Sequence, residues 1–365
     1  MKFKSFLSIV LFPFTLIYGC IVFVRNTLYD MQLFRSSEFR VPVISIGNIT
    51  VGGTGKTPHT EYLIDLFKTV GNIAVLSRGY KRKSKGYVVV SSSSPVAEVG
   101  DEPLQIKRKF SQVQVAVDAD RVHGINQLMK EDENLKVVLL DDAFQHRSVL
   151  PGLNILLIDY NRPIYDDLML PSGRLREPSS SRFRANIVIL TKCPDNIRPI
   201  DQRLLTMKLE LKAYQTLFFT RFVYSKPVAV FEKEAEDWYE AEGSVKKTAL
   251  LVTGIAQPKP FAEYAKRVVS VFDHLIYADH YQFEDKDYSA IVSKFEQMIG
   301  SQKVILTTEK DAARLRAAVH LPIDLKKALY YIPIQVEFLD NGKANFDQQV
   351  LSYITKNKRN SLLYK

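Results

Sequence analysis

The segment Gly47-Asn48-Ile49-Thr50-Val51-Gly52-Gly53-Thr54-Gly55-Lys56-Thr57-Pro58 decides the fold of this chain. It follows a short apolar run, 41–46, that predicts a buried strand, and it leads into a helical pattern over 60–68. Glycines let backbone N–H groups converge on phosphate oxygens, and the start of a helix adds partial positive charge. We therefore expect a phosphate-binding loop that uses the following residues: Gly52, Gly53, Thr54, Gly55, Lys56 and Thr57.

Within this loop, Lys56 is placed to reach the β- and γ-phosphates of a nucleotide, and the Thr57 hydroxyl to ligate Mg²⁺. Pro58 fits the first helical turn, where its missing N–H costs no hydrogen bond. One position departs from the strict pattern, because Thr50 stands where glycine is required. We expect Gly52 and Gly53 to supply the missing flexibility.

A second motif lies where another apolar run ends. Four apolar residues, 137–140, precede Asp141 and Asp142. A strand of this kind places the two acids at the carboxyl edge of a parallel sheet, where ligands bind in open α/β folds. Phosphate loops need such a carboxylate to hold the metal ion. The two motifs together predict a site for a magnesium nucleotide, with ATP as the default nucleotide.

The rest of the chain alternates short apolar runs with helical patterns, which predicts a mainly parallel, doubly wound α/β sheet. A second α/β set begins near residue 249, after a stretch over 204–224 that we interpret as an extended two-stranded connection. We expect a membrane helix over 1–27, a phosphate-loop domain over 28–212 and a smaller α/β domain over 213–365. The expected strands are 41–46, 73–76, 87–90, 113–117, 137–140, 154–158, 187–190, 249–252, 268–272, 304–306 and 329–332.

Composition limits the partners. The 365 residues carry a net charge of +10, which suits nucleic acid, anionic lipid or a phosphorylated substrate. Aromatic and basic residues do not interleave as they do in nucleic-acid-binding modules, so we expect no nucleic-acid partner. Cys20 and Cys193 are the only cysteines, which excludes a disulfide framework and a thiolate metal site.

The N-terminus contains 19 residues, 6–24, without a charge. As a helix this stretch would span about 30 Å, the thickness of the hydrocarbon core. Four interpretations stay open: a transmembrane helix, a lipoprotein signal that ends at Cys20, a helix lying in the inner leaflet, and a buried core helix. Pro13 and Gly19 weaken the first, and bulky Tyr18 weakens the second.

Several further short sequence motifs accompany the phosphate loop. They resemble those of the tetraacyldisaccharide 4′-kinase family, and the resemblance runs from the N-terminal apolar stretch to Asp311. The departures are Ala143, where glycine is usual, and a single histidine at His280, where many relatives have two. Besides the phosphate loop, the motifs are Leu76-Ser77-Arg78-Gly79-Tyr80, Gly100-Asp101-Glu102-Pro103, Asp141-Asp142-x-x-Gln145-His146, Leu175-Arg176-Glu177-Pro178, Thr253-Gly254-Ile255 and Asp279-His280.

The resemblance implies transfer of the ATP γ-phosphoryl group to the 4′-hydroxyl of a tetraacylated glucosamine disaccharide 1-phosphate, a precursor of lipid A. It implies that Asp101 and His280 form a base dyad beside the catalytic Lys56, after domain closure. It assigns Thr57, Asp141, Asp142 and Glu177 to the metal, and Arg121 and Arg176 to the nucleotide.

A lipid acceptor with four acyl chains implies an enzyme at the cytosolic face of the inner membrane. The basic residues Arg78, Lys81, Arg82, Lys83 and Lys85 could face its 1-phosphate or anionic headgroups. The alternative is a membrane-attached GTPase switch or metal-insertion protein. Thr191-Lys192-Cys193-Pro194-Asp195 is similar to a guanine-reading motif, but its aspartate comes one residue late. The oligomeric state stays undetermined.

Overall fold

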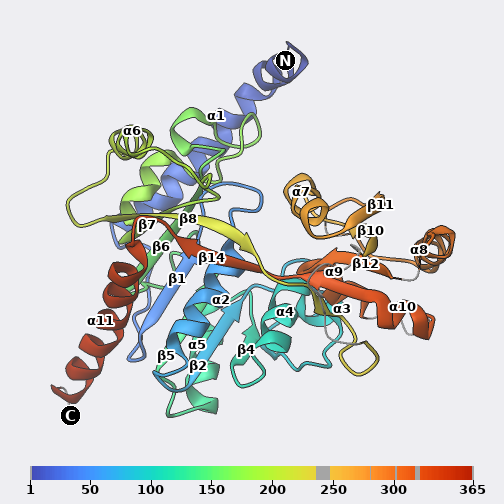
Figure 1. The fold of residues 1–365 in the computed structure, drawn as a ribbon. Coiled ribbons are helices and arrows are strands. Elements are labelled where there is room, and N and C mark those ends of the chain that lie inside the picture. Colours follow the sequence, from blue (N-terminus) through green and yellow to red (C-terminus); the bar gives the residue numbers. More distant parts are fainter. Residues whose placement is uncertain (1, 236–246, 280, 301, 317–320, 364–365) are drawn as a thin grey trace. The chain divides into compact units, whose positions relative to one another are not determined.

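The computed structural model describes residues 2–235, 247–279, 281–300, 302–316 and 321–363 (Figure 1). The chain forms two compact units, Met1–Phe222 with Val336–Lys365, and Val223–Gln335. The predicted boundary after residue 212 therefore falls ten residues before the observed one. The last thirty residues belong to the first unit rather than to the second, because helix α11 (Gly342–Leu363) packs Phe346, Val350 and Ile354 into the core of the large sheet.

The first unit is built on a nine-stranded sheet in the order β14-β8-β7-β6-β1-β5-β2-β4-β3. All strands from β8 to β4 in this order pair in parallel, and β3 is antiparallel to β4. The predicted doubly wound α/β fold is thus confirmed. The strands are β1 (Val43–Gly47), β2 (Ile73–Ser77), β3 (Val88–Val89), β4 (Gln114–Val117), β5 (Val137–Asp141), β6 (Leu153–Asp159), β7 (Ile187–Thr191), β8 (Thr216–Tyr224) and β14 (Ile334–Phe338).

Helices cover both faces of this sheet, so the strands are buried on both sides and consist of nearly continuous apolar runs. One face packs against α2 (Lys56–Phe67), α4 (Asp101–Lys109) and α11. The other packs against α5 (Arg121–Glu131) and α6 (Pro199–Leu209). Shorter elements are α3 (Val96–Val99), η1 (Ile164–Asp166) and η2 (Ser179–Arg184).

Helix α1 (Lys2–Asp30) is long and apolar enough over Val10–Asp30 to cross a membrane, and little of that stretch is buried. Side chains along it are held by the first unit. Thr15 Oγ1 lies 2.7 Å from Ser172 Oγ, and Arg25 donates to the Gln145 carbonyl at 2.6 Å. The N-terminal end of α1 extends away from the sheet of this unit (Figure 1). The exposure of Phe14, Ile17, Ile21 and Phe23 argues against a buried core helix.

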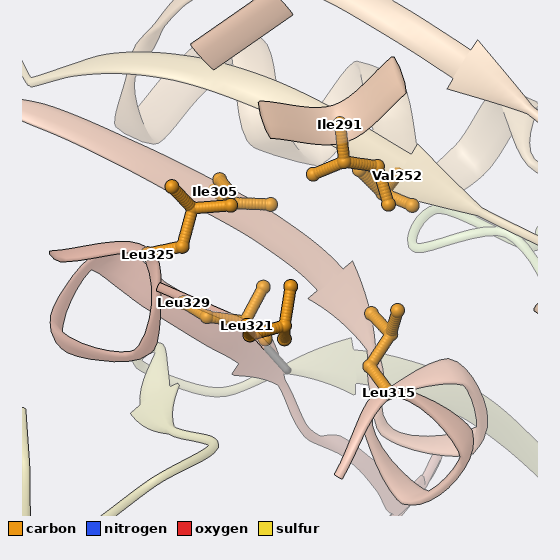
Figure 2. A pocket seen from close by; sticks show the side chains of 7 residues that line it. All are labelled: Val252, Ile291, Ile305, Leu315, Leu321, Leu325 and Leu329. Carbon is orange, nitrogen blue, oxygen red and sulfur yellow. The ribbon is translucent and has the colours of Figure 1, made fainter. Parts of the chain in front are cut away.

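The second unit has a five-stranded sheet in the order β11-β10-β12-β13-β9. Its core contains a cavity lined only by aliphatic side chains, among them Val252, Ile305 and Leu325, so it offers no hydrogen bond to a nucleotide or a sugar (Figure 2). The elements are β9 (Val228–Ala229), β10 (Thr248–Thr253), α7 (Lys259–Val268), β11 (Ser270–Ile276), α8 (Asp285–Gln297), β12 (Lys303–Thr308), α9 (Glu309–Leu315), α10 (Ile323–Ala328) and β13 (Leu329–Ile332).

The stretch 204–224 was predicted to form two extended strands, and its first part is wrong. Residues 199–209 form helix α6, with Pro199 at its first turn, where a proline is tolerated. Only Thr216–Tyr224 is a strand. The alternation of Leu209 and Leu211 misled the interpretation, because Leu209 is the buried residue that ends a helix rather than one face of a strand.

Candidate active site

The phosphate loop joins β1 to α2 at the carboxyl edge of the large sheet, as its sequence predicts. Two of its glycines have left-handed backbones, Gly52 with φ +107° and Gly55 with φ +90°. At Gly55 a Cβ atom would also lie 2.3 Å from Cζ of Phe222. Glycine is therefore required at this position both by the backbone conformation and by the space beside it.

Thr50, the departure from the strict pattern, has a simple explanation. It forms an antiparallel bridge with Leu175, flanked by the Val51 N–H to the Arg174 carbonyl at 2.8 Å and the Arg176 N–H to the Ile49 carbonyl at 2.7 Å. The backbone at Thr50 is thus paired and needs no glycine. The same bridge brings the polar loop around Arg176 beside the phosphate loop.

Asp141 ends β5 next to β1, in register with Ile46, and is almost fully buried. Its Oδ1 accepts from Thr60 Oγ1 at 3.4 Å, whereas its Oδ2 has no partner in the described part of the chain. Burial, with the nearby charges of Glu102 and Asp142, raises the pKa of Asp141 to about 7 despite Lys56. A buried carboxylate with an unused oxygen is suited to a cation.

Asp142 lies between two cations. Its Oδ1 is 3.6 Å from Lys56 Nζ, and its Oδ2 is 3.4 Å from Arg176 Nη1. Burial raises the pKa of Asp142, but Lys56 and Arg176 outweigh it, so this pKa lies below its ordinary value. The site thus holds one acid that is ionised readily and one that resists ionisation until a cation arrives.

Arg121, at the start of α5, is 1% exposed. One Nη donates to the Asp118 carbonyl, while Nε and the other Nη have no hydrogen-bond partner among the described residues. Burial lowers the pKa of Arg121 to about 10, and the charges of Asp141 and Asp142 oppose this, so the guanidinium remains charged at neutral pH. Such unused donors suit an anionic ligand.

The structure describes the surroundings of two of the remaining predicted site residues, Asp101 and Glu177, but not of His280. Asp101 is buried at the first position of α4, where its Oδ1 accepts the Glu102 N–H at 3.0 Å. Glu177 lies 2.5 Å from Arg184 and 3.8 Å from Arg25, and its Oε1 has no hydrogen-bond partner among the described residues. His280 lies outside the described residues. Within the described ranges, no three His, Cys, Asp or Glu side chains gather into a metal cluster.

Sequence reasoning gave no role to two side chains that contact the site. Gln145 donates to the Asn48 carbonyl at 2.7 Å and accepts from Arg176 at 3.3 Å. Lys192 donates to the Gly53 carbonyl. The strand-end pair Thr191-Lys192 was the available signal for the second, but it was weighed only as a base-reading motif.

A phosphate loop, a strand-end acid pair and two cations beside them define a P-loop phosphotransferase. Comparison with known proteins gives the particular family. Residues 7–355 match the family model described as tetraacyldisaccharide-1-P 4′-kinase. The chain belongs to this family, as its motifs suggested.

Named relatives agree over nearly the whole chain. The tetraacyldisaccharide 4′-kinase of Bacteroides thetaiotaomicron is 47% identical and that of Flavobacterium johnsoniae 44%, over 96% and 95% of this chain and 94% and 97% of theirs. The crystal structure of LpxK from Aquifex aeolicus in complex with ATP superposes with a TM-score of 0.73 at 28% identity, covering 95% of this chain and 99% of that one.

The alternative of a GTPase switch or metal-insertion protein is not favoured. Every named relative above is a kinase. In addition, Asp195 is 80% exposed and forms an ion pair with Arg221 at 3.0 Å, so the late aspartate of the Thr-Lys motif is not held for reading a base.

Proposed function

We propose that this protein transfers the γ-phosphoryl group of ATP to the 4′-hydroxyl of a tetraacyldisaccharide 1-phosphate. The observation that carries the proposal is the approach of Lys56 and Asp142 to 3.6 Å where the phosphate loop meets the end of β5. It occurs in a chain that matches the kinase family from residue 7 to 355. Nucleotide phosphates bound there would replace Asp142 as the partner of Lys56.

Mg²⁺ fits the residues present. Asp141 offers a buried oxygen without a partner among the described residues. Thr57 is buried at the start of α2, the helix that follows the neighbouring strand β1. Thr57 and Asp141, with Asp142 beside them, would hold the ion, which supplies charge stabilisation to the transferring phosphoryl group. Lys56, Arg121 and Arg176 then bind phosphate oxygens. Glu177, paired with arginines, serves to fix the loop that carries Arg176.

Asp101 is proposed as the general base. A sugar hydroxyl is a weak nucleophile, and a positioned carboxylate can accept its proton as the new P–O bond forms. The buried position at the start of α4 fixes this carboxylate. His280, its proposed partner, belongs to the second unit, so we propose that the two units close on each other during the reaction.

A membrane surface fits the substrate, because four acyl chains keep the acceptor in a bilayer. Helix α1 exposes Phe14, Ile17 and Ile21, each about 60% exposed. The same helix donates from Tyr18 Oη to the Arg176 carbonyl at 2.9 Å, which ties the apolar helix to a loop of the active site. The acceptor therefore need travel only a short way from lipid to the phosphate loop.

Helix α6 extends this apolar surface. It exposes Ile200, Leu204 and Met207, spaced for one helical face, and it also exposes Arg203 and Lys208. The segment from η1 to Met169 contacts both helices, because Met169 packs beside Gly19 of α1 and the Tyr165 ring lies 5.1 Å from Lys208 Nζ of α6. Apolar side chains with cations beside them suit an anionic bilayer, and the need for ATP favours the cytosolic side of the inner membrane.

The test is a transfer assay. Labelled ATP is mixed with detergent-solubilised tetraacyldisaccharide 1-phosphate, with and without Mg²⁺, for the wild type, Lys56→Ala and Asp101→Ala. We expect magnesium-dependent labelled lipid from the wild type and near loss from both variants. GTP hydrolysis without lipid product would overturn the proposal.

A further inference from the structure

Two side chains from the end of β7 hold the carbonyl groups of the phosphate loop. Thr191 Oγ1 donates to the Thr54 carbonyl at 2.8 Å. Lys192 Nζ donates to the Gly53 carbonyl and, at 2.7 Å, to Oδ2 of Asp159. Thr191 and Asp159 are almost fully buried, and the Lys192 side chain is 19% exposed. Both loop carbonyls are therefore held toward β7, one by the buried Thr191 and one by Lys192, which is paired with the buried Asp159.

Fixed carbonyls also fix the neighbouring N–H groups. In a planar trans peptide the C=O and the N–H point in opposite directions. The Gly53 carbonyl shares its peptide with the Thr54 N–H, and the Thr54 carbonyl shares its peptide with the Gly55 N–H. Holding both carbonyls toward β7 turns both N–H groups away from β7. In the described part of the chain neither N–H donates to any acceptor.

The backbone of Lys192 supports a built arrangement rather than a chance contact. Its φ is +59°, a left-handed conformation that a lysine rarely adopts. Strained residues of this kind persist where the surrounding structure holds them, often next to a functional site. The ion pair with Asp159 at 2.7 Å and the bond to the loop carbonyl hold Lys192 here.

We infer that Lys192 is a positioning residue that presets the Thr54 and Gly55 N–H groups for the phosphates of the nucleotide. The inference rests on the proposed function only in taking ATP as the ligand. Lys192 does not contact the transferring phosphoryl group, a task that falls to Lys56. Without its ammonium, the Gly53–Thr54 peptide is free to rotate, and the cradle must be ordered anew each time a nucleotide binds.

The experiment compares nucleotides that do and do not have a β-phosphate. Lys192→Met keeps the length of the side chain and removes its charge. We expect its affinity for ADP to fall about tenfold and its KM for ATP to rise by a similar factor, with AMP affinity and kcat changed less than threefold. Lys192→Arg should restore most of the ADP affinity, and Asp159→Asn should lose part of it.

Lys130→Met, a change at an exposed lysine of helix α5 in the same unit, is the matched control and should match the wild type throughout. ADP affinity of Lys192→Met equal to that of this control would overturn the inference. Equal losses for ADP and AMP, accompanied by a lower melting temperature, would also overturn it, because they indicate a structural role. ADP binding needs no acceptor, so a wild type that binds ADP but makes no lipid product would refute the proposed function alone.

Discussion

Replacing Asp141 by Asn should make the metal-free protein more stable while abolishing its activity. Asp141 is 1% exposed, and burial together with Glu102 and Asp142 raises its pKa from 3.8 to about 7. An acid whose pKa is raised by folding destabilises the folded state above that pKa, and the penalty disappears as pH falls toward 3.8. At about 1.4 kcal/mol per pH unit, the penalty is about 4 kcal/mol at pH 8 and about 2 kcal/mol at pH 5.

Asn is isosteric and uncharged, so Asp141→Asn removes this pH-dependent penalty. The new amide adds an unsatisfied buried donor that costs about 1–3 kcal/mol at every pH. The diagnostic quantity is therefore the difference between pH 8 and pH 5, an expected gain of about 2 kcal/mol in the free energy of unfolding. Denaturant unfolding of the full chain in EDTA measures it, with Asp65→Asn as a control, since Asp65 is half exposed beside Lys68.

Adding Mg²⁺ should reverse the order, because the ion stabilises only the protein that binds it. Phosphoryl transfer by Asp141→Asn should fall at least a hundredfold, the usual cost of losing such a preorganised charge. An equal stability difference at pH 5 and pH 8 would refute the reasoning, because it would mean that the Asp141 carboxyl is not held near neutrality by its surroundings.

Three further outcomes follow from named contacts. Gly55→Ala should cost at least about 1–3 kcal/mol in a thermal unfolding experiment, from its left-handed backbone. Gly53→Ala, with open space at its Cβ, should stay within about 0.5 kcal/mol; equal losses would contradict the loop geometry. Leu204→Glu should lower co-sedimentation with anionic vesicles severalfold, since fully burying a leucine side chain in lipid contributes about 1.5–3 kcal/mol of binding free energy. Ile323→Glu, an equally exposed change in the second unit, should not, and identical binding of the two would remove α6 from the membrane surface. Asp101→Asn should lower kcat about 10²- to 10⁴-fold with little change in KM for ATP, measured by steady-state kinetics; an unchanged kcat would eliminate Asp101 as the base.

The sequence predicted the parts of the site that are local in the chain. The strand, loop and helix around Lys56 lie within one short segment. The apolar run before Asp141 likewise predicts, from sequence alone, that Asp141 ends a strand. Thr50 could not be interpreted this way. Its pairing with Leu175 joins residues far apart in sequence, and only the fold shows why glycine is not needed there.

The same reasoning explains the larger errors. Lys192 and Gly53 are 139 residues apart, and no pattern near either residue indicates their contact. The end of helix α6 was taken for an extended segment because Leu209 and Leu211 alternate, whereas Leu209 is the buried last residue of the helix. The spacing of Phe346, Val350 and Ile354 does follow a helix, but nothing in that segment indicates which unit it joins.

A structure of the protein with Mg²⁺ and a non-hydrolysable ATP analogue tests the central claim most directly. We predict that the β-phosphate accepts hydrogen bonds from the Thr54 and Gly55 N–H groups. Lys56 should move from Asp142 to the phosphates, and the ion should contact Thr57 and Asp141. A triphosphate bound elsewhere, with Lys56 still paired to Asp142, would contradict the account.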